Sequence, residues 1–236
     1  MLSTFILVHS AWHGGWCWKR VVPLLRHAGH AVFTPTLTGL GERAHLMSDA
    51  IDLSTHIQDI LGVLQWEELT DVILCGHSYG GMVISGVADS VPEKLRAIVY
   101  LDAFVPEDGA CLMDYMGPER AVRFREAAQQ HGGGVRLAPI PAEVFRVNAQ
   151  DRAWVDQQCV AHPIKSFEQP LRLTGAWTTV PQRVYIYAAG YAPSVFTPFY
   201  ERLQRDPAWR TMSVPCGHEV MVDLPQALAQ MLLDVG

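Results

Sequence analysis

A serine set between two glycines is the most reactive feature of the sequence: Gly76-His77-Ser78-Tyr79-Gly80 reads G-x-S-x-G. The apolar run Val72-Ile73-Leu74-Cys75 precedes it, and a helical pattern follows to about Asp89. Such a tight strand–turn–helix has no room for side chains at the flanking positions, and it lifts the serine hydroxyl to the top of the sheet. We expect Ser78 to be a nucleophile. The alternative is a glycine-rich turn whose serine only caps the helix.

A serine hydroxyl is a weak nucleophile until a base takes its proton. In this arrangement the base comes from a loop after the last strand. His218, in Pro215-Cys216-Gly217-His218, lies between the last expected strand and the last expected helix. We therefore expect His218 to be the base, and we interpret His77 as structural because alternation points it away from the serine.

The acid that would orient the imidazole is harder to assign. The residues after the expected strand 184–187 read Ala188-Ala189-Gly190-Tyr191-Ala192-Pro193, and the next carboxylate is Glu201. An imidazole without an acid partner loses control of its tautomer, which costs orders of magnitude in rate. Asp102 ends the preceding strand and is the candidate acid there. The alternative is that Asp102 caps a turn and that Glu201, or no residue, takes the role.

Short β-rich runs alternate with helical patterns, which predicts a mostly parallel sheet with crossover helices in one α/β domain over 1–236. The expected strands are 5–8, 31–33, 72–75, 97–101, 184–187 and 210–214. Helices are expected at 16–27, at 54–66, after Gly76 to about Asp89, and in a final segment opened by Asp223, Pro225 and Gln226. The stretch 104–182 breaks this rhythm, and we expect it to be an inserted, mainly helical cap.

Composition excludes several classes of protein. Of the 236 residues 49% are hydrophobic and 18% are charged, which is not the composition of a disordered chain. The net charge of -6 argues against nucleic-acid binding. The five cysteines are scattered without a CxxC pair, so neither disulfides nor a metal site is indicated. No signal or membrane-spanning pattern is visible, so we expect a cytoplasmic protein that acts on a small molecule.

Three motifs together resemble the α/β-hydrolase superfamily: His9-Ser10-Ala11-Trp12-His13-Gly14-Gly15-Trp16, Gly76-His77-Ser78-Tyr79-Gly80-Gly81 and Gly217-His218. They are most similar to the branch of plant methylesterases, hydroxynitrile lyases and bacterial carboxylesterases of the pyrethroid-hydrolase type. The resemblance implies an α/β-hydrolase fold and a serine–histidine–acid enzyme without metal or organic cofactor. It makes Ser78 the nucleophile, His218 the base, and the N–H groups of Ala11 and Tyr79 the oxyanion hole.

That branch normally has its acid, an Asp, in the loop after the strand that 184–187 matches, and this chain departs from it there. Some related hydrolases look similar in taking the acid from the end of the preceding strand, and by this resemblance we favour Asp102. Two further departures from that branch bear on the reaction. Ser10 replaces its usual glycine where the lyases have a threonine, so Ser10 could contact the substrate. Glu219 follows the histidine where the lyases have a lysine that holds cyanide, and a negative charge there would repel cyanide. We therefore predict a serine carboxylesterase for apolar, uncharged esters, acting through an acyl-enzyme. The alternatives are a hydroxynitrile-type lyase and a ligand-binding relative with weakened catalysis. We also consider a homodimer.

Apolar residues of the expected cap could wall a substrate pocket, although each is more often part of a core. They are Phe104, Phe124, Trp154, Phe167 and Trp177, with Met113 and Met116. The charged runs Glu67-Glu68 and Arg120-Arg123-Arg125 are interpreted as solvated faces.

Overall fold

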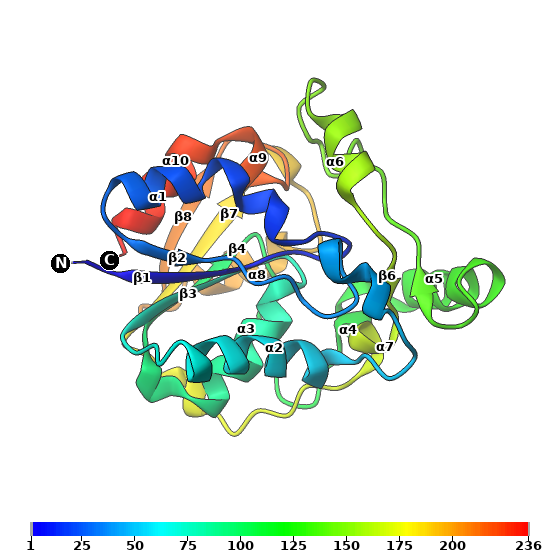
Figure 1. Ribbon diagram of the computed structural model, residues 1–236, viewed down its shortest axis with the longest axis horizontal. Helices are drawn as coiled ribbons and strands as arrows, with labels where there is room; N and C mark the ends of the chain where they lie inside the picture. The colour runs from blue at the N-terminus through cyan, green and yellow to red at the C-terminus, as the bar shows by residue number, and fades with distance from the viewer. Residues whose placement is uncertain (1, 236) are drawn as a thin grey trace.

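The computed structural model describes residues 2–235 and contains a six-stranded sheet in the order β2-β1-β3-β4-β7-β8 (Figure 1). Neighbouring strands all run parallel, as predicted. The strands are β1 (Thr4–Val8), β2 (Ala31–Phe33), β3 (Val72–His77), β4 (Leu95–Leu101), β7 (Gln182–Ala188) and β8 (Arg210–Val214). Because the order reverses between β1 and β3, their carboxyl ends border a crevice, where open α/β sheets bind ligands.

Helices cover both faces of the sheet, so the strands are buried on both sides. In Figure 1, α2 (Leu53–Trp66) and α3 (Gly80–Ser90) lie below the sheet, whereas α1 (Val22–His27), α9 (Val220–Asp223) and α10 (Pro225–Leu233) lie above it. Strand side chains alternate between the two resulting cores. Ile6 packs with the core on the α2 and α3 side, and Phe5 packs with the core on the α1 and α10 side.

The predicted helix over 16–27 is in fact two elements. A 3-10 helix spans Gly15–Arg20, and α1 begins at Val22 with Pro23 in its first turn. Proline has no N–H and its ring obstructs the preceding turn, so one continuous helix through this position is disfavoured. Shorter 3-10 helices occupy Gly41–Leu46, Pro92–Lys94, Ala176–Thr179 and Ala189–Tyr191.

Helices make up most of the regular secondary structure in the segment between β4 and β7. It contains α4 (Leu112–Met116), α5 (Pro118–His131), α6 (Arg152–Gln158) and α7 (Lys165–Glu168), with an antiparallel pair of short strands, β5 (Arg136–Leu137) and β6 (His162–Pro163). The helix α8 (Thr197–Leu203) follows β7. Figure 1 shows α5 and α6 standing away from the sheet, beyond the carboxyl ends of its strands.

Trp12, in the loop after β1, joins this segment to the sheet through its backbone and its side chain. The Trp12 backbone N–H donates to Nδ1 of His162, and its indole Nε1–H donates to the Leu137 carbonyl. Both partners belong to the small β5–β6 sheet, so the segment is held over the crevice that β1 and β3 border.

Across residues 2–235, no helix combines the length and apolar character needed to cross a membrane.

Candidate active site

Ser78 occupies a sharp turn between β3 and α3. Its φ is +54°, a conformation that non-glycine residues seldom adopt. A Cβ on Gly76 would lie 2.6 Å from the Gly80 carbonyl oxygen, and one on Gly80 would lie 2.9 Å from the Val8 carbonyl oxygen. The flanking glycines are therefore required by backbone contact, and the turn has the strand–turn–helix form that the sequence predicts.

Asp102 accepts a hydrogen bond from His218, with 2.6 Å between its Oδ2 and the imidazole Nδ1. The carboxylate is fully buried at the end of β4, where its Oδ1 also accepts from the Ala188 N–H at 3.2 Å. Burial raises the pKa of Asp102, and the hydrogen bond from His218 opposes this rise. A proton held on Nδ1 leaves the imidazole Nε2 free to accept one. Glu201, the alternative acid, is exposed on α8.

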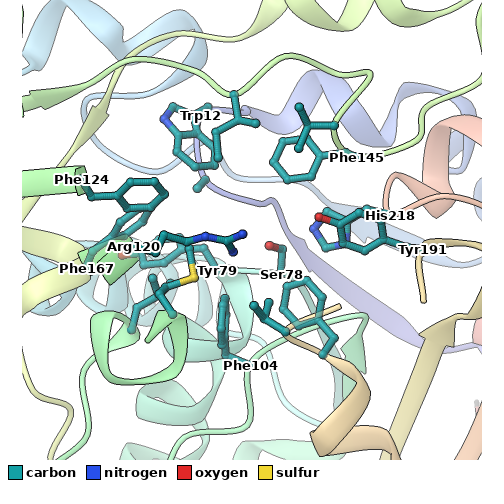
Figure 2. A pocket seen from close by; sticks show the side chains of 17 residues that line it. Trp12, Ser78, Tyr79, Phe104, Arg120, Phe124, Phe145, Phe167, Tyr191 and His218 are labelled. Atoms are coloured by element: carbon teal, nitrogen blue, oxygen red, sulfur yellow. The ribbon is translucent and has the colours of Figure 1, made fainter. Parts of the chain in front are cut away.

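The His218 ring is fixed from several sides. It stacks on Phe196, with ring centroids 4.8 Å apart and planes 9° apart. Its backbone N–H donates to the Phe145 carbonyl at 2.9 Å. Ser78 and His218 line the same cavity, and Figure 2 shows the serine hydroxyl and the imidazole side by side there. The carboxyl ends of β3 and β4 and the loop after β8 thus bring Ser78, Asp102 and His218 together.

Two backbone N–H groups expected to hold an oxyanion belong to residues of this cavity wall. Ala11 and Tyr79 both line it beside Ser78. Within residues 2–235, neither N–H group donates a hydrogen bond to the protein. Both donors therefore remain available to a ligand oxygen at the serine, which is the arrangement that an oxyanion hole requires.

His9 fixes one of these two peptides. Its Nδ1–H donates to the Ser10 carbonyl at 2.8 Å, while its Nε2 accepts from the Leu37 N–H at 3.0 Å. Burial lowers the pKa of His9 to about 3, so the ring is neutral and these partners set its tautomer. The Ser10 carbonyl and the Ala11 N–H belong to one peptide group, so His9 orients that N–H. The sequence showed His9 within a motif but not this contact.

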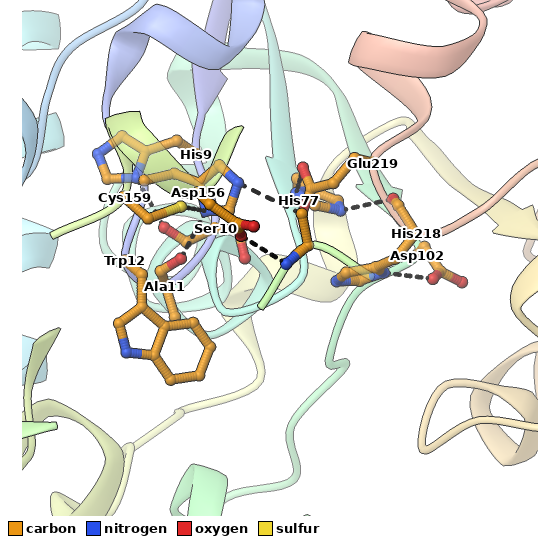
Figure 3. Close-up of polar contacts among 12 residues, drawn as sticks. His9, Ser10, Ala11, Trp12, His77, Asp102, Asp156, Cys159, His218 and Glu219 are labelled. Atoms are coloured by element: carbon orange, nitrogen blue, oxygen red, sulfur yellow. Dashed lines mark hydrogen bonds and ion pairs between the residues drawn. The ribbon is translucent and has the colours of Figure 1, made fainter. Parts of the chain in front are cut away.

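A buried carboxylate lies behind the imidazole of His218. Glu219 places Oε1 3.4 Å from His13 Nε2 and Oε2 3.9 Å from His77 Nδ1. Burial disfavours the charged carboxylate, yet the imidazole of His13 holds the pKa of Glu219 below its ordinary value. Burial also acts to lower the pKa of His13, but Glu219 raises it well above its ordinary value. Glu219 and His13 therefore form a buried ion pair. Figure 3 shows Glu219 and His77 close to His218, whose imidazole contacts Asp102.

His77 connects this pair to the backbone of His218. Its Nε2–H donates to the His218 carbonyl at 3.0 Å, and burial lowers the pKa of His77 to about 3. His77, His218 and Glu219 bring potential metal-ligand atoms within 4.8 Å of one another. The His77 Nε2 and the His218 Nδ1 are, however, already engaged by hydrogen bonds within the protein.

The cavity at Ser78 measures about 120 Å³ and is lined mainly by apolar and aromatic side chains. Four of the side chains considered as walls line it: Phe104, Phe124, Phe167 and Met116. Trp154, Trp177 and Met113 are outside the lining, and Ser10 is buried outside it as well. Arg120, interpreted from the sequence as part of a solvated face, does line the cavity.

Comparison with known proteins agrees with this architecture. Residues 5–231 match the model of the alpha/beta hydrolase family. The chain is 49% identical to the carbendazim hydrolyzing esterase of Nocardioides sp. (strain SG-4G), over 100% of both chains. It is 36% identical to methylesterase 9 of Arabidopsis thaliana, over 45% of this chain and 42% of the relative.

Among solved structures, an extracellular alpha/beta-hydrolase from a Paenibacillus species superposes with a TM-score of 0.86 at 22% identity, over 99% of both chains. That likeness extends to the sheet, its covering helices and the inserted segment alike. With the family match over nearly the whole chain, it shows that this protein belongs to the alpha/beta hydrolase family.

Proposed function

We propose that this chain hydrolyses carboxylic esters with apolar bodies, through an acyl-enzyme formed on Ser78. The observation that carries this proposal is the 2.6 Å hydrogen bond between Asp102 and His218 beside a serine held at a strained turn. The relative that is 49% identical over the full length of both chains is an esterase, which supports the same activity. The mainly apolar cavity suits a small apolar ester.

The reaction follows from the positions of these groups. His218 Nε2 accepts the Ser78 proton as Oγ attacks the ester carbonyl carbon. The N–H groups of Ala11 and Tyr79 stabilise the resulting oxyanion, and Asp102 stabilises the imidazolium. His218 then protonates the leaving alcohol, and water hydrolyses the acyl-enzyme by the same path.

Short-chain p-nitrophenyl esters test the nucleophile. We expect wild-type protein to release a burst of p-nitrophenol equal to the enzyme concentration, and Ser78→Ala to lose at least about 10³-fold in kcat. Ser48→Ala, at an exposed loop serine, is the matched control. Activity that survives in Ser78→Ala would refute the assignment. Carbendazim is the next substrate to test, by analogy with the relative that hydrolyses it.

Rapid labelling by an organophosphonate separates this enzyme from a non-catalytic ligand-binding relative, since only an activated serine reacts quickly. A lyase that depends on Ser10 is less well supported, because Ser10 lies outside the cavity lining. We further propose a cytoplasmic location, in keeping with five unpaired cysteines. A homodimer stays a prediction.

A further inference from the structure

Arg120 is the one arginine or lysine among the described residues that line the cavity. It lies in the first turn of α5, and its side chain is exposed, as is that of Val144. Most other lining residues, such as Phe104 and Phe167, are buried. Arg120 and Val144 therefore mark the solvent-facing rim. Figure 2 shows the Arg120 side chain reaching from this rim over the cavity, with its guanidinium directed inward.

The neighbouring arginines of α5 have partners within the protein, whereas Arg120 does not. Arg123 Nε–H donates to the Glu119 carbonyl, and Arg125 Nε–H donates to the Glu168 carboxylate at 2.7 Å. In the described part of the chain, Arg120 makes no ion pair, no hydrogen bond and no stacking contact with an aromatic ring. Among the residues that the structure describes, no Asp or Glu lines the cavity either. The five N–H donors and the positive charge of Arg120 thus face an apolar cavity in which the described residues provide them with no acceptor or negative charge.

We propose that Arg120 binds an acceptor group, most strongly a carboxylate, at the end of the ester substrate that is remote from the scissile bond. This inference rests on the proposed function and departs from the uncharged ester that the sequence predicts, because Arg120 lines the cavity. The reacting carbonyl would lie at Ser78, the apolar body would contact the aromatic walls, and the remote acceptor would meet the guanidinium at the rim. A guanidinium offers paired donors that match a carboxylate. Water partly screens the exposed rim, so we expect a preference of about tenfold rather than one of several hundredfold.

Three para-substituted methyl benzoates of nearly equal shape test the proposal. The para groups are carboxylate (charged acceptor), nitro (neutral acceptor) and isopropyl (no acceptor). Because each substrate has its own intrinsic reactivity, kcat/KM for the carboxylate or nitro substrate is divided by kcat/KM for the para-isopropyl substrate. This ratio is then compared between each variant and the wild type. Arg120→Met removes charge and donors, and Arg120→Lys retains the charge alone. Arg123→Met, one helical turn farther along α5 and outside the cavity lining, is the matched control.

In Arg120→Met the carboxylate-to-isopropyl ratio should fall about tenfold and the nitro-to-isopropyl ratio about threefold. Arg120→Lys should recover part of the carboxylate preference, and Arg123→Met should retain all of it. Raising the salt concentration should weaken the wild-type carboxylate preference, because an exposed charge is screened. A structural role of Arg120 would not give this salt dependence.

The proposal is overturned if the carboxylate ratio is unchanged in Arg120→Met, or if Arg123→Met lowers it equally. Hydrolysis of the para-isopropyl substrate, which has no acceptor for Arg120, distinguishes a failure of this proposal from a failure of the proposed function. If wild-type protein cleaves no methyl benzoate and no p-nitrophenyl ester, ester hydrolysis itself fails. The role of Arg120 is then tested by binding alone. Calorimetry measures the affinity for terephthalate monomethyl ester, which should be lower for Arg120→Met than for the wild type.

Discussion

Ser78 and Asp102 share an unusual backbone conformation at the ends of neighbouring strands. Their φ values are +54° and +41°. Such conformations cost of order 1–3 kcal/mol each and persist only where the surrounding structure enforces them. Here the Ser78 N–H donates to the Leu101 carbonyl, and the Asp102 N–H donates to the Ile186 carbonyl. Strand-to-strand hydrogen bonds thus hold both side chains at the cavity end of the sheet.

Replacing the Asp102 carboxylate should separate its role from that of Glu201. Asp102→Asn presents an amide to His218 Nδ1, which favours the wrong imidazole tautomer and removes the charge that stabilises the imidazolium. We expect kcat to fall by about 10³-fold or more. Glu201→Gln alters an exposed carboxylate on α8 and should leave kcat within about twofold. Steady-state hydrolysis of p-nitrophenyl butyrate measures both. Equal losses in the two variants would exclude Asp102 as the specific partner.

At the residue scale, the sequence predicts most where a local pattern constrains the backbone. The flanking glycines predict the sharp turn that the structure has at Ser78. Asp102 contacts His218 as expected, and the catalytic roles of these residues stay predictions. Arg120 was missed because an arginine run on a helix is normally solvated. Its neighbours Arg123 and Arg125 do follow that pattern, with partners on the protein surface. Only the position of α5 over the sheet distinguishes Arg120 from them.

The element that matters most is the strand–turn–helix of β3 and α3. A helix N-terminus aims at Ser78, and close backbone contacts leave no space for a Cβ at Gly76, Gly80 or Gly81. The hydrophobic runs predicted the strands well, since strands covered on both faces are continuously apolar. The break near Val21 was less visible, because the apolar periodicity continues across it. Backbone geometry at Pro23 decides that boundary.

A pair of glycine substitutions tests this element. In Gly76→Ala the new Cβ would lie 2.6 Å from a backbone oxygen that cannot move without displacing α3. We expect a loss of at least about 2 kcal/mol in the free energy of unfolding, with a parallel loss of activity. Gly62→Ala in α2 meets only the Trp66 ring edge at 3.9 Å and should stabilise the protein by up to about 1 kcal/mol. Urea unfolding measures both. Similar stabilities of the two variants would contradict the packing argument.

On the scale of the whole molecule, buried imidazoles join loops and helices that come from separate parts of the chain. His56 Nδ1 lies 2.7 Å from the Tyr79 hydroxyl, and its Nε2 lies 2.9 Å from the Thr38 carbonyl. His162 accepts from the Trp12 N–H and lies 2.8 Å from the Ser166 hydroxyl. The strand alternation predicts the sheet, but it carries no signal for these contacts. All but the His162–Ser166 contact join residues 18 or more positions apart in sequence, and their polar atoms pair only once the chain is folded.

These imidazoles should make the protein labile in mild acid. Burial lowers the pKa of His9 and of His77 to about 3 and that of His56 to about 4, and it lowers the pKa of His162 well below its ordinary value. In the unfolded chain each titrates near pH 6.5, so below about pH 6.5 the unfolded state binds protons that the folded state refuses. Each neutral buried histidine therefore contributes its full stabilisation above about pH 6.5. This contribution is lost as the pH falls toward about 4, at roughly 1.4 kcal/mol per pH unit for each histidine.

Other buried groups change this slope little between about pH 6.5 and 4.5. The pKa of His13 is raised, so His13 is protonated in both states there and cancels. Asp102, whose pKa is raised by burial, opposes the loss by at most one proton. Urea unfolding between these pH values should therefore show a fall of several kcal/mol in the free energy of unfolding. His56→Gln should reduce the slope by about one proton, because one imidazole is then missing from the unfolded state. A stability independent of pH over this interval would mean that the buried imidazoles accept protons in the folded protein, and that their burial does not keep them neutral.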